Sequence, residues 1–256
     1  EHRPVHCAEV AKTADAVGDG NLIGGRRVSR RLQELRCCHA LILQALLEYY
    51  RRKPDLPREG FELKEIPFIV ELNKSGGVVQ IEDTRYLEGK KNRAKTFLLP
   101  QSEKKSVNVA ANLLWGNAEY VLGLPDKKKL DERKADGKEK EYRARLKDMH
   151  QAFTARIAAL PQQALADEGI RAVTRFLGDL DTKALKHFEE PWKEIVETNP
   201  NLTFRLRGDV GLVCQRPTVM DAIGNRGVNR SDWRTCLVTG ELDEVERLHP
   251  AVKGVW

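Results

Sequence analysis

The chain has 256 residues, of which 41% are hydrophobic and 32% are charged, with a formal net charge of +6 and an isoelectric point near 9.0. The mean hydropathy of -0.52 and the lack of any run of about 18 apolar residues exclude a membrane-spanning helix, and scattered charge near the start argues against a secretory signal, so we expect a cytoplasmic protein. The excess of cations favours a polyanionic partner such as nucleic acid, whereas an aromatic content of 6% argues against single-strand binding mainly by base stacking.

Residues 1–40 differ in composition from the rest of the chain. They hold a glycine-rich patch, Gly18–Gly25, followed by an arginine-rich run, and no apolar periodicity lasts long enough to form a core element. We expect either a disordered or non-native upstream extension that does not belong to the folded domain, or a mobile basic arm of the native protein.

The next segment predicts a helix and then antiparallel strands. From Leu41 the apolar residues of LILQALLEYYRR have helical spacing, and two prolines follow that helix. Residues 61–72 indicate a strand broken at Pro67, and a turn at residues 73–77 joins it to a strand over 78–83, which together predict a hairpin. We expect a basic loop over 88–95, a third strand in TFLLP and a polar loop over 101–108.

A helical section is predicted between two groups of strands. We expect a helical turn over 112–123 and a charged helix over 127–160 with one apolar stripe. Helices over 163–177 and 182–198, the second broken at Pro191, follow it. Alternation over 201–217 then predicts a second hairpin that turns at Gly208-Asp209. The residues of the stripe are Tyr142, Leu146, Met149, Phe153 and Ile157. The predicted fold class is α+β, with antiparallel hairpins and an inserted helical section.

The sequence contains no motif typical of catalysis, a cofactor or a metal. Walker, GxGxxG, CxxC and HExxH patterns do not occur, so we predict no catalytic residue, no cofactor and no metal. Three carboxylates near the basic loop, Glu82, Asp83 and Glu88, are of the kind found in metal nucleases, but solvated surface charge explains them better. The cysteines are odd in number and match no disulfide or zinc framework, which favours free thiols in a reducing cytoplasm. They are Cys7, Cys37, Cys38, Cys214 and Cys236.

Two basic loops are the best candidates for a binding site. Residues 85–105 contain seven cations and two acids. Lysine and arginine contact phosphates, whereas asparagine and arginine can also reach base edges. A loop whose charges are simply solvated is the alternative. The predicted nucleic-acid-binding residues are Arg85, Lys90, Lys91, Asn92, Arg93 and Lys95 in and beside the first loop, and Lys104, Lys105 and Asn108 in the second.

Several blocks in a fixed order resemble one protein family. LILQALLEYYRR, IEDTRYLEGKKNRAKTFLLPQ, NLLWGNAEYVLG, LTFRLRGDVGLVCQRP and CLVTGELDEVERLHPAVKGV are similar to successive blocks of the large subunit of the type I-C CRISPR surveillance complex, Cascade. The resemblance covers 41–256 and leaves out 1–40. Members of this family continue beyond the GVW at which this chain stops, into a C-terminal helical bundle, so we expect a truncated N-terminal part of a larger protein.

The resemblance implies a non-catalytic, RNA-guided role in antiviral defence. The large subunit recognises a protospacer-adjacent motif in double-stranded DNA, supports R-loop formation and takes part in recruiting a helicase-nuclease. Its other partners are the CRISPR RNA and the remaining Cascade subunits, with no membrane. On this reading Lys90, Lys91, Arg93 and Lys95 bind phosphates, Asn92 approaches a groove edge, and the second loop makes a further contact.

The sequence is also compatible with two other functions. A metal-dependent nuclease or another DNA-processing enzyme predicts a convergent cluster of acids. A scaffold that holds only RNA and neighbouring subunits predicts a basic surface that is indifferent to the sequence of the DNA.

Overall fold

The computed structural model describes residues 42–103, 109–180, 184–224, 233–236 and 242–244. By their contacts, these residues belong to two units, one of Glu1–Arg52 with Thr235–Asp243 and one of Lys53–Arg234 with Glu244–Trp256. The first unit contains a helix over 42–52, where the sequence predicts one. Residues 1–40, predicted to be an upstream extension, lie outside the described residues, as does most of the chain after 236.

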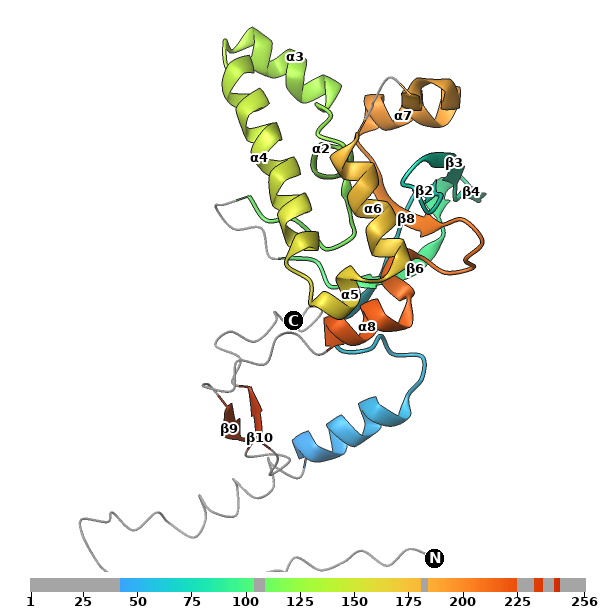
Figure 1. The fold of residues 1–256 in the computed structure, drawn as a ribbon, viewed down its shortest axis with the longest axis vertical. Helices are drawn as coiled ribbons and strands as arrows, with labels where there is room; N and C mark the ends of the chain where they lie inside the picture. Colours follow the sequence, from blue (N-terminus) through green and yellow to red (C-terminus); the bar gives the residue numbers. More distant parts are fainter. Residues whose placement is uncertain (1–41, 104–108, 181–183, 225–232, 237–241, 245–256) are drawn as a thin grey trace, which may run out of the picture. The chain divides into compact units, whose positions relative to one another are not determined.

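The larger unit contains a four-stranded mixed sheet in the order β3-β2-β8-β7, of which β3, β2 and β8 are labelled in Figure 1. The β2–β3 and β7–β8 pairs are antiparallel, whereas β2 and β8 are parallel, with Phe68 opposite Leu202. The larger unit also contains two further antiparallel pairs, β1–β6 and β4–β5. The strands are β1 Phe61–Glu65, β2 Phe68–Leu72, β3 Val78–Asp83, β4 Arg85–Glu88, β5 Lys91–Ala94, β6 Thr96–Pro100, β7 Trp115–Asn117, β8 Asn201–Leu206, β9 Trp233–Thr235 and β10 Leu242–Glu244.

Helices pack on this sheet and form a second layer. Phe204 of β8 is fully buried, and its ring centroid lies 6.4 Å from that of Phe153 on α4 and 5.9 Å from that of Phe176 on α6. Such aromatic contacts join the helical layer to the sheet in one core. The helices are α2 Ala118–Val121, α3 Lys127–Ala135, α4 Glu139–Ala158, α5 Gln162–Leu165, α6 Glu168–Gly178, α7 Glu189–Thr198 and α8 Pro217–Gly224, with 3-10 turns η2 Ala184–Phe188 and η3 Val213–Gln215.

Much of the predicted architecture is confirmed. The class is α+β, the strand over 61–72 is broken at Pro67, and the hairpin of β2 and β3 forms with the predicted turn. All five residues of the predicted apolar stripe are buried on α4. The helical section lies between β7 and β8, so it connects two neighbouring strands of the sheet.

The predicted helical boundaries need correction. The helix predicted over 127–160 is two helices, because Gly137 adopts a φ of +69° between α3 and α4. Within the helical turn predicted over 112–123, residues Trp115–Asn117 form strand β7 and residues Ala118–Val121 form helix α2. The helix predicted over 163–177 is α5 followed by α6. Pro191 does not break α7: it lies in the first turn, where a helix needs no backbone N–H donor.

The predicted second hairpin is wrong. Residues 201–206 do form a strand, and the chain does turn there, with Gly208 at a φ of +93°. The residues after the turn, however, form η3 and α8 and bury Leu212, Val213 and Cys214 in the core. The alternation in GLVCQRP was too short to distinguish a strand from a buried turn. Burial also raises the pKa of the Cys214 thiol to about 12, so this thiol is inert at neutral pH.

Candidate nucleic-acid interface

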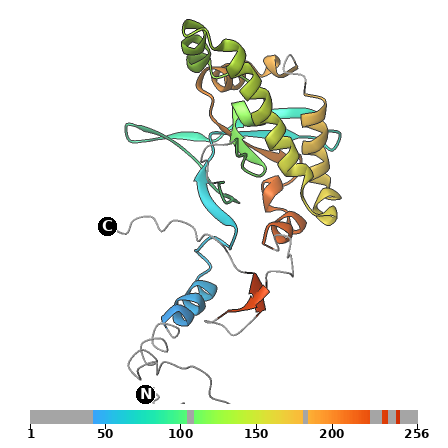
Figure 2. The ribbon, with the colours of Figure 1, turned by 90° about the vertical axis from the view of Figure 1, so that its left-hand side faces the viewer.

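The predicted basic loop over 88–95 is instead the end of a β-hairpin, formed by β4 and β5. Tyr86 faces Arg93 across the strands, Leu87 faces Asn92, and Glu88 faces Lys91. All residues from 86 to 93 are exposed, and Figure 2 shows the hairpin extending away from the body of the unit. We call residues 85–94 the arm. The prediction of a loop was wrong because the period-two pattern of RYLE and KNRA carries few apolar residues.

The turn of the arm consists of Gly89 and Lys90. Of these two residues Gly89 has a positive φ, +61°, which is typical of a two-residue hairpin turn with glycine in the first central position. This turn matches the right-handed twist of the strands, so the cations on either side of it have a defined backbone geometry.

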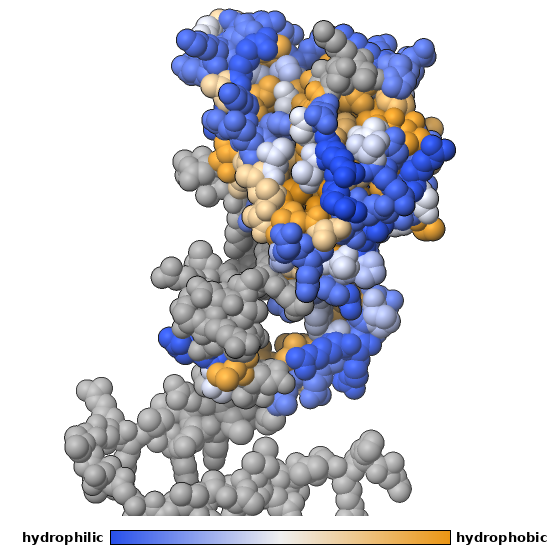
Figure 3. Space-filling view, viewed as in Figure 1, coloured by the Kyte–Doolittle hydropathy of each residue, from blue (hydrophilic) through white to orange (hydrophobic). Residues whose placement is uncertain are grey.

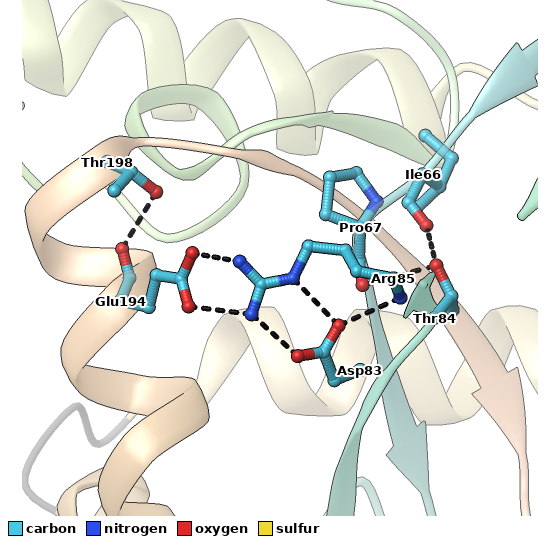
Figure 4. A network of polar contacts seen from close by, with 7 residues as sticks. All are labelled: Ile66, Pro67, Asp83, Thr84, Arg85, Glu194 and Thr198. Carbon is cyan, nitrogen blue, oxygen red and sulfur yellow. Dashed lines mark hydrogen bonds and ion pairs between the residues drawn. The ribbon is translucent and has the colours of Figure 1, made fainter. Parts of the chain in front are cut away.

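Arg85 fixes the base of the arm. Its guanidinium donates to Asp83 Oδ2 at 2.6 Å and to Glu194 Oε2 at 2.6 Å, with a further bond to Glu194 Oε1 (Figure 4). The guanidinium also lies 4.8 Å from the ring centroid of the buried Phe68. The hydrogen bond from Arg85 lowers the pKa of the Asp83 carboxyl, and the hydrogen bonds to Asp83 and Glu194 raise the pKa of the guanidinium. Arg85 therefore ties the arm to α7.

Thr84 attaches the same base to the segment between β1 and β2. Its hydroxyl donates to the carbonyl of Ile66, and its backbone N–H donates to the carbonyl of Pro67 at 2.9 Å. The N–H of Lys95 donates to the carbonyl of Thr84 at 3.3 Å, so this bond joins the two strands of the arm at its base. Because Thr84 is buried, these bonds hold the arm where it leaves the core.

Two other predicted cations also have carboxylate partners. Arg93 Nη2 lies 2.6 Å from Glu65 Oε1, and its Nε lies 3.7 Å from Glu88. Lys95 Nζ lies 3.7 Å from Glu82, which also pairs with Arg205. Since these pairs are partly exposed, the cations keep some access to an outside phosphate, but they start from a neutralised state.

The remaining predicted residues of the arm, Lys90, Lys91 and Asn92, lie at its exposed end. Within the part of the chain that the structure describes, none of the three side chains has an ion pair or a side-chain hydrogen bond. Two ammonium groups and an amide are thus available to a partner. The structure brings these three residues together, separate from the partnered cations at the base.

Two exposed apolar side chains on the arm were missed by sequence reasoning. Leu87 is 78% exposed and lies opposite Asn92, and Tyr86 is 48% exposed and lies opposite Arg93. If residues 85–94 are taken as a hairpin, side chains that face each other across the two strands share one face. Leu87 and Asn92 are such a pair, so a predicted hairpin would have shown the exposed leucine. The end of the arm therefore combines cations, an amide and an apolar side chain.

The second predicted loop is described only at its ends. Lys104, Lys105 and Asn108 lie outside the described residues. On either side of them, the N–H of Glu103 donates to the side-chain oxygen of Asn112 at 3.0 Å, and Glu103 pairs with Arg156 of α4. The ends of this segment are thus attached to the core.

The carboxylates near the arm do not form a metal site. Glu82 pairs with Arg205 and Lys95, Asp83 with Arg85, and Glu88 lies near Arg93. Across the described ranges, no group of three or more His, Cys, Asp or Glu residues is arranged to hold a metal ion. These acids neutralise cations instead of converging on one point, as two-metal chemistry requires.

Comparison with known families identifies the chain. A family model described as CRISPR-associated protein (Cas_Csd1) matches residues 46–256, which is more than half of the sequence. The chain belongs to this CRISPR-associated Csd1 family. The match supports the predicted resemblance to a Cascade large subunit, and it covers the whole arm. No curated protein matches the chain. None of the helices within the described ranges combines the length and apolar composition needed to cross a bilayer.

Proposed function

We propose that this Csd1-family chain acts as the non-catalytic large subunit of a type I-C CRISPR RNA-guided surveillance complex. In that role it recognises a protospacer-adjacent motif in double-stranded DNA and supports R-loop formation in the cytoplasm. Its partners are the CRISPR RNA, the other Cascade subunits and the helicase-nuclease that acts after target binding. Family membership supports the CRISPR role, and the free cations of the arm support contact with DNA.

The end of the arm is the observation that carries the proposal. Lys90 and Lys91 are exposed and unpaired within the described residues, so they can neutralise phosphates without first breaking an internal ion pair. Asn92 lies one residue further on and offers an amide, which can bond to a base edge. Phosphate contacts then position the arm, while Asn92 contributes to sequence preference.

Arg85 has a different part in this proposal. Its side chain is only 23% exposed, and its guanidinium is shared by Asp83 and Glu194. It supports the arm that carries Lys90 and Lys91 and does not itself contact DNA. Arg93 in the arm and Lys95 directly after it add cationic charge, but both are paired with carboxylates.

The test is charge reversal at the end of the arm. In a reconstituted complex, Lys90→Glu with Lys91→Glu should weaken binding to motif-bearing duplex, because two phosphate contacts become repulsive. The slope of log affinity against log salt should fall by about one unit for each lost contact. Binding is measured by fluorescence anisotropy on duplexes with and without the motif. Lys186→Glu with Lys193→Glu, which changes two exposed lysines on η2 and α7, is the matched control.

The same measurement distinguishes the alternatives. Unchanged binding in the Lys90/Lys91 variant would remove the arm from target recognition. Equal binding to both duplexes by the unmodified complex would favour a scaffold that holds only RNA and subunits. Magnesium-dependent cleavage of the duplex by the isolated chain would favour a nuclease.

A further inference from the structure

A second cationic feature lies on the helical side of the unit, away from the residues of the arm. Residues of α3 and α4, together with α2, line an open pocket of about 690 Å³. This volume falls in the range of small-ligand sites and is large enough for one nucleotide unit. The lining residues are Asn117, Glu119, Tyr120, Lys129, Arg133, Lys138, Glu141, Tyr142, Arg145 and Met149. In Figure 3 the region of α3 and α4 is covered mainly by hydrophilic residues.

At the floor of the pocket lies a buried carboxylate whose oxygens accept hydrogen bonds from several neighbouring side chains. Glu119, whose side chain is 3% exposed, accepts from the Tyr142 hydroxyl at 2.7 Å, Lys129 Nζ at 2.9 Å and Asn199 Nδ2 at 2.9 Å. Burial alone would raise the pKa of Glu119, but the hydrogen bonds from these three groups outweigh it and lower the pKa below its usual value. The carboxylate is therefore ionised and already paired with Lys129, so it repels an incoming anion only weakly.

The rim of the pocket carries three cations with no internal partner. Arg133, Lys138 and Arg145 are exposed, and none of them has an ion pair within the described part of the chain. Glu141 is the remaining acid among the lining residues. With Lys129 and Glu119 cancelling each other, the pocket has a net excess of two positive charges.

Local structure holds these cations on one side. Arg133 lies four residues after Lys129 on α3, so both occupy the same helical face. The carboxylate of Asp126 caps α3 by accepting from Lys129 N at 3.1 Å, and the chain reverses at Gly137, which has a φ of +69°. The helix cap and the chain reversal thus fix α3 and α4 beside each other, so that the three cations line the same pocket.

We propose that this pocket binds backbone phosphates of a nucleic-acid strand. Guanidinium groups bind phosphate oxygens in a two-pronged geometry, and two of the three free cations are arginines. The aromatic lining residues Tyr120 and Tyr142 are buried, so they offer no platform for base stacking. Binding through phosphates alone makes the site indifferent to base sequence.

This site shares no residue with the arm and does not depend on the role proposed for it. The arm combines unpaired cations with an exposed amide and an exposed leucine, whereas the pocket combines three unpaired cations with one further acid, Glu141, and two buried tyrosines. The arm is therefore suited to reading sequence, and the pocket to holding a strand of any sequence.

The test compares two triple variants of the full chain. The pocket variant is Arg133→Ala, Lys138→Ala, Arg145→Ala. The control variant is Lys128→Ala, Lys140→Ala, Lys147→Ala, which removes three exposed cations of the same two helices that do not line the pocket. Both lose the same charge, and circular dichroism with thermal melting checks that both fold. Affinity is measured by fluorescence anisotropy with mixed-sequence single-stranded DNA, single-stranded RNA and duplex DNA over a range of salt concentrations.

The pocket variant should lose about tenfold in affinity for at least one of these oligonucleotides at low salt, as expected for three lost exposed ion pairs. Its slope of log affinity against log salt should fall by about two units for a single strand, since each phosphate contributes about 0.7. The control variant should change affinity by less than about twofold. Equal losses in both variants would mean that only net charge matters and would overturn the proposal. It would also be overturned if the pocket variant lost affinity for inorganic phosphate or a polyglutamate peptide but kept its affinity for every oligonucleotide.

Discussion

The base and the end of the arm contain the same kinds of side chain but use them differently. At the base, Arg85 is half-buried, contacts two carboxylates and stacks on Phe68. At the end, Lys90 and Lys91 are exposed and have no carboxylate partner in the described structure. A cation at the base therefore contributes to folding, whereas a cation at the end is available for binding. Counting positive charges along the sequence does not distinguish the two.

The base and the end of the arm also differ in which groups lose a partner when the cation is replaced. Removing Arg85 would leave Asp83 and Glu194 close together, next to a buried aromatic ring, with no cation between them. Removing Lys90 or Lys91 would not uncover a buried group and would not leave a carboxylate of the described residues without its cation. Stability and binding should therefore respond to different substitutions on the same arm, and this is open to measurement.

The largest expected effect is on stability at the base. Arg85→Ala should lower the free energy of unfolding by about 2 kcal/mol, because it removes the guanidinium hydrogen bonds to Asp83 and Glu194 and the packing on Phe68. The backbone N–H of residue 85, which also donates to Asp83, is retained in this variant. Urea unfolding followed by circular dichroism measures this. Arg85→Lys is the control: it keeps the charge but cannot bridge both carboxylates in the same way, so it should recover only part of the loss. A change below about 0.5 kcal/mol in Arg85→Ala would contradict a supporting role for this residue.

The sequence predicted the body of the fold better than the arm. The stripe on α4 was predicted correctly because five apolar residues at helical spacing leave only one face to bury. The split between β1 and β2 was predicted because Pro67 cannot donate to a ladder. The arm was predicted as a loop because its stability comes from backbone pairing and from anchors such as Glu194, which is 109 residues away from Arg85 in sequence.

The candidate site was predicted in composition but not in organisation. The sequence placed cations between 85 and 95, and the structure does gather Lys90, Lys91 and Asn92. It could not show that Arg85 and Arg93 have carboxylate partners, because Glu194 and Glu65 come from distant strands and helices. The pocket between α3 and α4 was also missed, since interleaved acids made this stretch resemble an ordinary solvated helix surface.

Lowering the pH should reduce the stabilisation that Arg85 provides at the base of the arm and should not affect the end of the arm. The hydrogen bond from Arg85 lowers the pKa of Asp83, so the stabilisation is fully present above the unfolded pKa, near 3.8, and is lost as pH falls through the folded value. The stability difference between the unmodified chain and Arg85→Ala should thus be constant from pH 7 to about pH 5 and should shrink below about pH 4. Urea unfolding at a series of pH values measures it. A difference that stays constant down to pH 2 would show that the Arg85–Asp83 pair does not contribute.

The smallest expected effect is on stability at the end of the arm. Lys90→Ala with Lys91→Ala should change the free energy of unfolding by less than about 0.5 kcal/mol, because both side chains are exposed and unpaired within the described structure. The measurement is the same urea unfolding as for Arg85, with Arg85→Ala as the positive control. If the double variant were destabilised as much as Arg85→Ala, the two lysines would be part of the fold, and loss of DNA binding on their replacement could no longer be attributed to lost phosphate contacts. A stable double variant with weakened binding would instead locate the recognition surface at the end of the arm.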